Sequence, residues 1–471
     1  MPAERIDNYY SASCNRDERY PTLEESVATD VLIIGGGMTG VATAVELAER
    51  GSEVVLLEAN RIGWGATGRN GGQVTGSLSG DAAMLRQLTR RHGREHAEDT
   101  LRWLRWHGHE IIERRVARYG IDCDLTHGHL FTAWNAAHVP ELEATLDEAR
   151  AAGLADEVTW LDRDQVHEQL ATPLYAGAIL NRRNFHLHSL NLCLGEAAAA
   201  ASLGVRIHEQ TEVMSIESTA SRLEPPGHRA PTRPALRTLS VSSSRQAPTS
   251  AAHGNEIERT ASAPVIARTS HGEVRAERLV LAGNAYHRLL PRQLSGFVFP
   301  AVLGNLVTEP LGEDRARQLI RDNVAVYDSR MVLDYYRLTA DHRLMFGGGT
   351  NYTGREIPDV ATNLRPALER VFPSLAGIAV DYAWTGKAAI VPNRIPIIGQ
   401  LPGNILFAQG YSGHGMASSH ILAEVLADHL HGESQRFETL SRLRHLRLPI
   451  GETLGGAAMA LAMAFHRLRE K

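Results

Sequence analysis

The chain has 471 residues, of which 43% are hydrophobic and 22% are charged, and its formal net charge at pH 7 is −5. These values are typical of a globular protein with two or three domains, and the lack of a basic bias argues against a nucleic-acid partner. The three cysteines, Cys14, Cys123 and Cys193, are far apart and form no C-x-x-C pair. We therefore expect a reducing compartment, no disulfide framework, and no metal site of the zinc or iron–sulfur type.

Two segments near the chain ends bear on membrane association. The N-terminal residues lack the apolar run of a signal peptide. Residues 454–465 form the longest apolar stretch, but a helix that spans a bilayer needs about 20 residues. We predict a cytoplasmic protein without a transmembrane segment, in which this stretch belongs to a C-terminal tail helix over residues 446–471.

A βαβ unit follows an N-terminal arm, which we predict to be irregular over residues 1–29. Residues 31–34 are a short apolar run of strand type, and apolar residues then recur at helical spacing from Val41 to Ala48. Gly51 ends that helix, and residues 54–57 form a second apolar strand. This alternation predicts a parallel, doubly wound sheet.

The predicted secondary structure changes twice in the middle of the chain. Residues 94–119 predict a long helix that ends at Gly120, within a stretch rich in helix and charge. Residues 295–390 are rich in predicted strand and include strand-like runs at 331–338 and 344–347. Between these stretches the chain is expected to return to the first sheet.

One segment, about residues 220–264, is rich in proline, serine, threonine, alanine and arginine and poor in aromatic and β-branched residues. Such a composition buries too little apolar surface to offset the entropy of ordering. Strand-like runs at 212–216 and 265–269 flank it. We predict a disordered insertion in a hairpin, without a catalytic role.

The strongest motif is a G-x-G-x-x-G sequence over residues 35–40, between the first strand and the first helix. Gly35 permits the tight turn, Gly37 lets a pyrophosphate approach the backbone, and Gly40 lets helix and strand pack closely. The N–H groups at the start of the helix then favour an anion. Glu58 ends the second strand, where an acidic residue binds the adenosine ribose. The predicted contacts at this dinucleotide site are Gly35, Gly37, Met38, Thr39, Gly40, Glu58 and Ala59.

A second glycine-rich loop, residues 63–73, follows Glu58 directly and distinguishes a flavin from a nicotinamide cofactor. An NAD-binding domain would continue into another helix here, whereas FAD must be threaded from its pyrophosphate to its ring system. Small residues allow a close backbone approach to such a ligand. The predicted FAD contacts in this loop are Gly65, Ala66, Thr67, Arg69, Asn70, Gly71, Gly72 and Gln73.

A third segment that could contact a ligand follows a predicted strand at 405–408. The turn over residues 410–415 is rich in glycine, and a helix follows it until Gly432. The helix N-terminus would stabilise the negative charge of a reduced flavin. The turn is not a G-x-S-x-G nucleophile elbow, because His414 occupies the last position. The predicted contacts are Gly410, Ser412, Gly413, His414 and Gly415.

These segments resemble the D-amino-acid-oxidase-like FAD oxidoreductases, which include glycine and sarcosine oxidases. Within this superfamily the chain is most similar to the bacterial group of γ-glutamylputrescine oxidases and L-pipecolate oxidases. The matching motifs extend over nearly the whole chain and comprise residues 9–13, 35–40, 65–73, 188–190, 281–286, 334–338, 393–396 and 410–415.

The resemblance implies an α/β protein with a Rossmann-like FAD-binding lobe and a second α+β substrate lobe built on a large antiparallel sheet. It also implies that Val213 contacts the adenine and that Ala282 and Gly283 lie near the pyrophosphate. Some relatives attach the flavin to a cysteine, but none of the three cysteines lies in a matching motif, so we expect non-covalent FAD. The expected division is an arm at 1–29, an FAD lobe at 30–80, 185–290 and 391–445, a substrate lobe at 81–184 and 291–390, and the tail helix at 446–471.

Three residues are candidates for catalysis. On the strand around residues 334–338, Tyr335 and Arg337 share one face and Tyr336 lies on the other. An arginine near the flavin can hold a substrate carboxylate with two hydrogen bonds. Lys387, the only internal lysine, could assist oxygen reduction through its charge. The alternatives are a surface arginine and a solvated lysine, and the three H-x-H pairs of the chain are interpreted as structural.

The implied reaction is hydride transfer from the carbon that bears nitrogen to the flavin, which carries the redox chemistry. The favoured substrate is γ-glutamylputrescine, converted to the γ-glutamyl aminoaldehyde with release of ammonia and hydrogen peroxide. The alternatives are an L-pipecolate oxidase and a flavin dehydrogenase that reduces a quinone instead of oxygen. An NAD-dependent dehydrogenase leaves the second and third loops unexplained, and a nucleotide-binding regulator has no supporting motif. The sequence does not indicate an oligomeric state.

Overall fold

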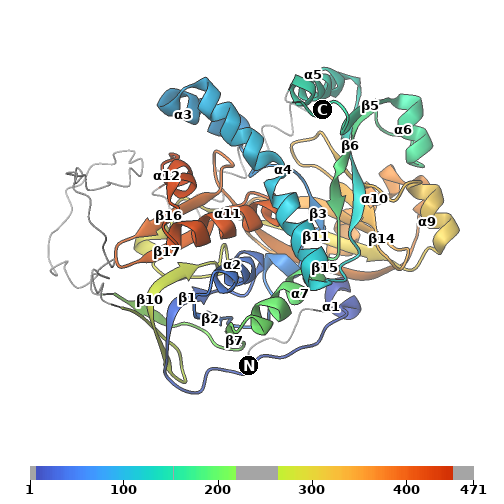
Figure 1. Cartoon of the computed structure of the whole chain (residues 1–471). Helices are drawn as coiled ribbons and strands as arrows, with labels where there is room; N and C mark the ends of the chain where they lie inside the picture. The colour runs from blue at the N-terminus through green and yellow to red at the C-terminus, as the bar shows by residue number, and fades with distance from the viewer. Residues whose placement is uncertain (1–6, 152, 219–263, 449–471) are drawn as a thin grey trace.

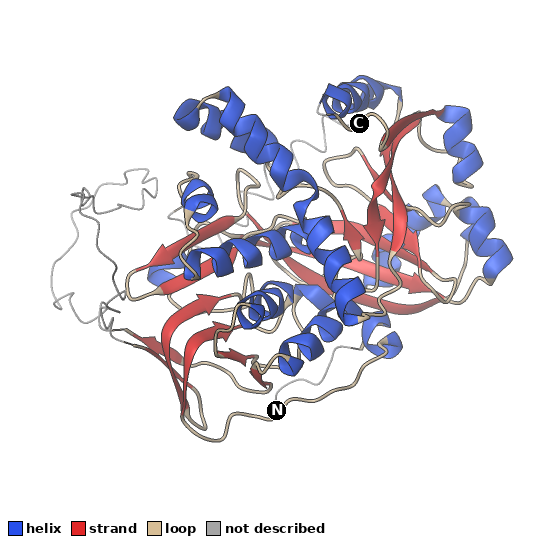
Figure 2. Ribbon diagram, viewed as in Figure 1, coloured by secondary structure: helices blue, strands red, loops and turns tan. Residues whose placement is uncertain are grey.

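The computed structural model describes residues 7–151, 153–218 and 264–448 (Figure 1). Nearly all of the predicted disordered insertion and of the predicted tail helix lie outside the described residues. The described chain forms two lobes, each built on one sheet, and helices lie between and around the sheets (Figures 1 and 2).

The first lobe contains an eight-stranded sheet within the described residues, with the central order β16-β17-β10-β1-β2-β7. Strand β1 is parallel to both β10 and β2, and β10 is parallel to β17. The predicted strand at 54–57 is confirmed, and the predicted run at 31–34 is the second half of β1. The bounds are β1 Val27–Ile34, β2 Val54–Leu57, β7 Arg206–His208, β8 Ser215–Glu217, β9 Val265–Arg268, β10 Glu273–Leu281, β16 Ile397–Leu401 and β17 Ile405–Gln409.

Four helices cover one face of this sheet. They are α2 (Met38–Glu49), α4 (Arg94–Tyr119), α7 (Ser189–Ser202) and α11 (Gly415–Leu430), which lie together in the centre of Figure 1. The predicted helix at 94–119 is confirmed, and Gly120 caps it in the left-handed conformation. Ile112 of α4 belongs to the same hydrophobic cluster as Val41 of α2. Helix α4 therefore packs on the FAD lobe, whereas the predicted division places it in the substrate lobe; its apolar side faces α2, α7 and α11.

The second lobe contains a nine-stranded sheet within the described residues, with the main path β15-β11-β14-β13-β12-β4-β6-β3. Its pairs are antiparallel except for β12 with β4. This confirms the predicted fold class. The bounds are β3 Gln73–Val74, β4 Thr126–Ala133, β5 Val158–Asp162, β6 Gly177–His186, β11 Phe299–Thr308, β12 Ala325–Asp328, β13 Tyr335–Leu338, β14 Leu344–Asn351 and β15 Val380–Ile390.

Two predicted strands begin later than expected. Strand β13 begins at Tyr335 rather than at 331, because Arg330 bridges Asp328 and Asp334 across a tight connection from β12. Strand β8 begins at Ser215 rather than at 212. Met214 already donates its N–H to the carbonyl of Arg268 in β9, but the chain up to residue 211 bonds to the segment that follows β2. Thr211, for example, donates its N–H to the carbonyl of Glu58.

The N-terminal arm is less irregular than predicted. It contains the short helix α1 (Tyr9–Ser13), and β1 already begins at Val27. Tyr9 and Tyr10 are buried, and the ring of Tyr10 contacts the rings of His188 and Trp384. These aromatic contacts fix the arm against both lobes.

The remaining helices lie on the outside of the two lobes. Helix α10 (Val360–Val371) covers the outer face of the second sheet, where Gly304 of β11 faces Val360 and Leu364. No helix in the described part of the chain is long and apolar enough to cross a membrane. The others are α3 Asp81–His92, α5 Val139–Ala151, α6 Arg163–Gln169, α8 Pro291–Leu294, α9 Glu313–Leu319 and α12 Gln435–Ser441.

Candidate active site

The first glycine loop joins β1 to α2. Gly35 has φ +113°, and a Cβ there would lie 2.9 Å from the carbonyl carbon of Ala282. A Cβ on Gly40 would lie 1.9 Å from the carbonyl oxygen of Gly35. Both positions therefore require glycine, as the motif predicted. The N–H of Met38 donates to Oγ1 of Thr67 at 3.0 Å, which joins this loop to the second one.

Glu58 lies at the end of β2, beside the first loop. Its carboxylate accepts the N–H of Gly36 at 2.7 Å and the N–H of Asn60 at 2.8 Å. Burial raises the pKa of Glu58 above its ordinary value. The carbonyl of Glu58 also accepts the N–H of Thr211, which brings the 211–213 segment to the same edge of the sheet. Glu58 is thus held next to the glycine loop, where the ribose of a dinucleotide is expected.

Val213 has a backbone suited to the predicted adenine contact. Its side chain is buried in the cluster that also contains Leu57 and Leu281. Neither its N–H nor its carbonyl forms a hydrogen bond with the residues that the structure describes. A base at this position would find both a donor and an acceptor.

The second loop, residues 63–73, is anchored from the first lobe by side chains that are distant in sequence. The amide of Asn8 donates to the carbonyl of Gly68 at 2.8 Å. The hydroxyl of Ser189 donates to the carbonyl of Thr67 at 2.7 Å. Within the loop, Asn70 donates to the carbonyls of Ala66 and Thr67. The loop is therefore a fixed element.

The second sheet holds the same loop from the opposite side. The carbonyl of Arg69 accepts hydrogen bonds at 3.0 Å from both the amide of Asn305 and the indole N–H of Trp384. Gln73 donates to the carbonyls of Val326 and Tyr336. The loop therefore lies between the two lobes, where a ring system threaded from the first lobe would meet the second sheet.

Arg69 and Trp64 lie at one edge of this loop. The guanidinium of Arg69 covers the ring of Trp64, at 4.6 Å from its centroid, and donates to the carbonyl of Thr385. The ring of Tyr286 lies 3.5 Å from a Cβ built on Gly65. These bulky residues close the side of the loop toward β15.

The third turn, residues 410–415, connects β17 to α11. The N–H of Gly410 donates to the side chain of Asn284 at 2.9 Å, and the hydroxyl of Tyr411 bonds Oγ1 of Thr39 at 2.7 Å. Ser412 donates its N–H to the carbonyl of Ala389 at 2.9 Å. Gly413 has φ +95°, and no atom lies within 4 Å of a Cβ built there. A side chain at position 413 would therefore meet no neighbouring atom, but its backbone conformation favours glycine.

Tyr335 faces the second loop, and Tyr336 lies on the opposite face of β13, as the alternation of the strand predicted. A Cβ on Gly71 would lie 2.5 Å from its ring, and a Cβ on Gly347 would lie 2.2 Å from it. Its hydroxyl donates to the side chain of Asn305 at 2.9 Å, and burial raises its pKa. Tyr336 lies on the other face, where its ring contacts Phe372. Tyr335 therefore supports the loop through its ring.

Arg337 is buried, with 3% of its surface exposed, so the alternative of a surface arginine is wrong. Four of its five N–H donors are used by acceptors of the protein itself. Lys387 differs: its side chain is 39% exposed, and Nζ lies 3.3 Å from the carboxylate of Glu356. The structure thus supports the solvated alternative for Lys387.

The sequence motifs did not predict the residues that anchor the second loop. Asn305 and Trp384 come from β11 and β15, while Asn8 precedes α1 and Ser189 begins α7. A single polar or aromatic residue within a strand carries no local signal for such a contact. Ser189 is a partial exception, because it belongs to one of the motifs on which the family resemblance rests.

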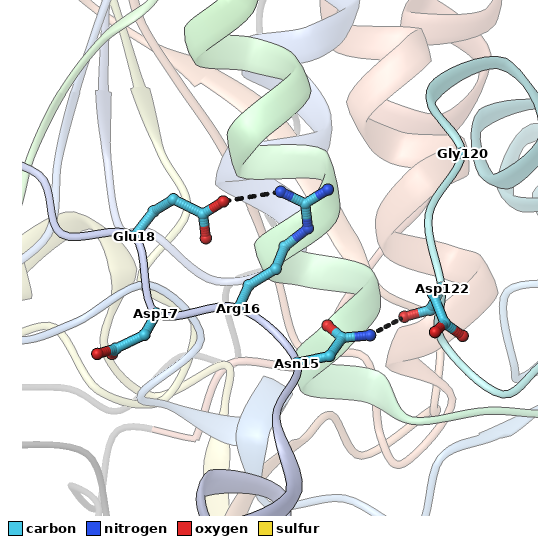
Figure 3. A pocket seen from close by; sticks show the side chains of 6 residues that line it. All are labelled: Asn15, Arg16, Asp17, Glu18, Gly120 and Asp122. Atoms are coloured by element: carbon cyan, nitrogen blue, oxygen red, sulfur yellow. Dashed lines mark hydrogen bonds and ion pairs between the residues drawn. The ribbon is translucent and has the colours of Figure 1, made fainter.

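Two other features of the chain have no direct part in this site. A hollow lined by Asn15, Arg16, Asp17, Glu18, Gly120 and Asp122 lies between the arm and the end of α4 (Figure 3). Arg16 is bonded to Glu18 there, and no residue of the three cofactor turns lines it. Among the described residues, no group of three or more His, Cys, Asp or Glu side chains could hold a metal ion.

The three turns follow the carboxyl ends of β1, β2 and β17 and are hydrogen-bonded to one another, and two helices, α2 and α11, begin there. Helix N-termini favour phosphates and other anions, and such crevices at the ends of parallel strands bind dinucleotides. The glycine cradle fits a pyrophosphate, and Glu58 fits a ribose. A second sheet that faces the crevice defines the class as a two-lobed flavoprotein.

The chain belongs to the DAO family of FAD dependent oxidoreductases, which it matches over residues 30–235 and 250–429. It is 36% identical to the gamma-glutamylputrescine oxidoreductase of Escherichia coli (strain K12), with 99% of each chain covered. It is 28% identical to the probable oxidoreductase OrdL of Haemophilus influenzae, over 99% of this chain and 98% of that protein. The fold is similar to glycine oxidase from Geobacillus kaustophilus, with TM-score 0.63, 21% identity, and coverage of 86% and 95%.

This membership confirms the predicted FAD cofactor and the predicted oxidoreductase that acts on amines or amino acids. When bound, FAD supplies the hydride acceptor of the reaction. The first loop, Glu58 and the third turn are the residues that would hold it, and the second loop would place its ring system against the second sheet.

Proposed function

We propose that the chain oxidises the primary amine of γ-glutamylputrescine to the γ-glutamyl aminoaldehyde. The observation that carries this proposal is the 36% identity to the E. coli gamma-glutamylputrescine oxidoreductase over 99% of both chains. In the overall reaction the amine, oxygen and water give the aldehyde, ammonia and hydrogen peroxide. The carbon that bears nitrogen loses two electrons as a hydride, the nitrogen loses a proton, and oxygen gains the two electrons and two protons as hydrogen peroxide.

The position of the substrate carboxylate favours this amine over L-pipecolate. L-Pipecolate carries its carboxylate on the carbon next to nitrogen, so its binding needs a cation close to the reacting atoms. Arg337 uses four donors within the protein, and Lys387 is paired with Glu356. Arg337, the cation predicted to hold a carboxylate, is therefore engaged elsewhere, and so is Lys387, which was predicted to assist oxygen reduction. γ-Glutamylputrescine carries its carboxylate at the end remote from the amine and needs no such anchor.

The cofactor contacts follow from the turns described above. We propose that the backbone of residues 35–40 binds the pyrophosphate and that Glu58, with Ala59 beside it, binds the ribose. Val213 receives the adenine. The 65–73 loop and the 410–415 turn hold the ring system, with Ala282 and Gly283 beside the pyrophosphate. The carboxylate of Glu58 keeps acceptor capacity after its two backbone hydrogen bonds.

We propose that FAD is held without a covalent bond. Cys123 and Cys193 are buried, and Cys14 is partly buried in the arm. Cys193 lies under the first loop, where its sulfur is 3.9 Å from the carbonyl of Gly36. This position is close to the proposed pyrophosphate site rather than to the second sheet. Acid precipitation of the yellow protein should therefore leave all of the flavin in the supernatant.

The experiment that tests the function is a stoichiometry measurement. Purified holoenzyme is mixed with γ-glutamylputrescine, putrescine or L-pipecolate, and oxygen, peroxide, ammonia and aldehyde are measured. The proposal predicts equal yields of peroxide, ammonia and aldehyde with γ-glutamylputrescine and slow turnover with the other two. Oxidation of L-pipecolate alone would overturn it. Rapid dye or quinone reduction with slow oxygen uptake would show that the protein is a dehydrogenase rather than an oxidase.

A further inference from the structure

Arg337 lies at a junction of four chain segments. Its Nε donates to the carbonyl of Gly71 at 2.8 Å, and its Nη2 donates to the carbonyl of Leu187 at 3.0 Å and to the hydroxyl of Tyr10 at 3.2 Å. Its Nη1 donates to the carbonyl of Leu338 at 2.9 Å. The guanidinium therefore joins helix α1, the second cofactor loop, the connection from β6 to α7, and its own strand.

The contact with the cofactor loop is reinforced at the next residue, Gly72. A Cβ on Gly72 would lie 2.9 Å from Nη2 of Arg337, so only glycine fits beside the guanidinium. The N–H of Leu187 donates to the carbonyl of Gly72 at 2.8 Å. Arg337 and Leu187 together hold this part of the loop from behind.

The charge of Arg337 has no carboxylate in direct contact with it, although Asp124 lies close enough to interact with this charge. All four of its acceptors are neutral, and it forms no ion pair with the carboxylates that the structure describes. Arg343, in the turn that connects β13 to β14, is bonded to Asp341 and Asp381. Burial of an unpaired charge is unfavourable, and such charges concentrate at functional sites.

Neighbouring side chains respond to this charge. Burial and, second, the charge of Arg337 lower the pKa of His186 and of His188 to about 3. The Nδ1 of His188 accepts the N–H of Asn191, which is the geometry of a neutral ring. The imidazoles around Arg337 therefore stay uncharged, and its positive charge is the dominant one behind the loop.

We propose that Arg337 is a positioning residue that fixes residues 70–72 of the cofactor loop and whose unpaired charge raises the reduction potential of the flavin held by that loop. A positive charge in a medium of low dielectric constant stabilises the negative charge that reduction adds. This inference rests on the proposed placement of FAD along residues 65–73. It gives Arg337 a role that does not require contact with the substrate.

Three variants separate the two parts of this role. Arg337→Lys keeps the charge but loses the fork of donors, Arg337→Met removes the charge, and Tyr10→Phe removes one acceptor and leaves the charge in place. FAD affinity is measured by titration of the apoprotein, and the two-electron reduction potential is measured by spectroelectrochemistry with excess FAD. Arg343→Met is the matched control, because it removes an arginine whose charge is already neutralised.

The expected result is that Arg337→Met disfavours flavin reduction by at least about tenfold in the equilibrium constant, which corresponds to about 30 mV. Arg337→Lys and Tyr10→Phe should keep the wild-type potential within about threefold in that constant and bind FAD more weakly. The control should change neither quantity. If Arg337→Met holds FAD at an unchanged potential, the electrostatic part is contradicted.

If Arg337→Lys and Tyr10→Phe bind FAD as tightly as the wild type, the positioning part is contradicted. The Tyr10→Phe result decides this part even if the Arg337 variants do not fold. These measurements need no substrate, so they stand apart from the substrate proposal. Failure of the proposed function would appear instead as a yellow wild-type protein that does not oxidise γ-glutamylputrescine.

Discussion

His420 and Glu196 form a fully buried pair in which Nε2 of the imidazole lies 3.0 Å from the carboxylate. The Nδ1 of His420 lies 2.7 Å from the carbonyl of Met416. Both partners are acceptors, so each ring nitrogen of His420 faces a group to which an N–H can donate. Arg115 completes the group through hydrogen bonds to Glu196 and Glu46. The network joins α2 and α11, the two helices that begin at the cofactor turns, to α4 and α7.

The first prediction concerns the stability that Glu196 contributes. Burial raises the pKa of Glu196, but the charges of His420 and Arg115 outweigh burial and lower it to about 2. A folded pKa below the ordinary value stabilises the protein above about pH 4.5, and the stability is lost as pH falls toward the folded pKa. Glu196→Gln should therefore reduce the free energy of unfolding by about 3–5 kcal/mol near neutral pH.

Urea unfolding of the wild type and of Glu196→Gln at neutral and acidic pH checks this prediction. The difference between the two proteins should narrow as pH falls below about 4.5. Glu98→Gln is the control, since Glu98 forms an exposed pair with Arg94 that is worth about 0–1 kcal/mol. A difference that stays constant with pH would contradict the linkage.

The second prediction concerns the contact between Gly71 and Tyr335. Gly71→Ala places a methyl group 2.5 Å from the Tyr335 ring, so the loop must shift, and FAD affinity should fall by at least about tenfold, or about 1.4 kcal/mol. Gly120→Ala is the control. It introduces left-handed strain of about 1–2 kcal/mol at a site with open space and should leave FAD affinity unchanged. Equal FAD affinities in the two variants would argue against the placement of the cofactor.

The third prediction assigns Tyr335 a supporting role. Tyr335→Phe keeps the ring against Gly71 and removes the hydrogen bond to Asn305. A buried acceptor left without its donor costs about 1–3 kcal/mol, so the melting temperature should fall. Steady-state kinetics should show kcat within about threefold of the wild type, since a group that does not transfer protons adds little to the rate. A loss of a hundredfold or more would show instead that the hydroxyl takes part in the chemistry.

The fourth prediction concerns Glu58. Glu58→Gln keeps the shape of the side chain but removes the charge that accepts hydrogen bonds from Gly36 and Asn60. Hydrogen bonds to charged groups contribute about 1.5–3 kcal/mol, so FAD affinity should fall about tenfold or more. Glu53→Gln, at an exposed position before the same strand, is the control. Unchanged FAD affinity in Glu58→Gln would contradict the proposed ribose contact.

The fifth prediction concerns Lys387. Because its ammonium is exposed and paired with Glu356, Lys387→Met should change stability by no more than about 1 kcal/mol. Stopped-flow mixing of the reduced enzyme with oxygen should give a reoxidation rate within about threefold of the wild type. A strong decrease in that rate with unchanged flavin reduction would restore the catalytic role that the sequence suggested.

The parts of the fold that could be predicted from the sequence are those that depend on local patterns. Gly35, Gly40 and Glu58 stand at fixed spacings around one strand and one helix, and the structure shows the close contacts that explain the glycines. The helix at 94–119 was predicted with the same bounds because Gly120 marks its end. Local patterns of this kind therefore predict the same elements that the folded structure contains.

The parts that could not be predicted depend on contacts between distant segments. From its strand alone, Arg337 was predicted to bind the substrate carboxylate, but its hydrogen-bond partners come from positions 10, 71 and 187. The start of β13 was missed because Arg330 pairs with Asp328 at the end of β12 and with Asp334 just before β13. In each case the role of the residue depends on a tertiary contact that its neighbours in the sequence do not indicate.

The most direct test of the account is an anaerobic mixing experiment with the holoenzyme. Purified yellow protein is mixed without oxygen with γ-glutamylputrescine, and the flavin absorbance is followed, with L-pipecolate and putrescine in parallel cuvettes. Rapid bleaching by γ-glutamylputrescine and much slower bleaching by the other two are expected. Persistent yellow colour with γ-glutamylputrescine, or rapid bleaching by L-pipecolate alone, would contradict the proposed function.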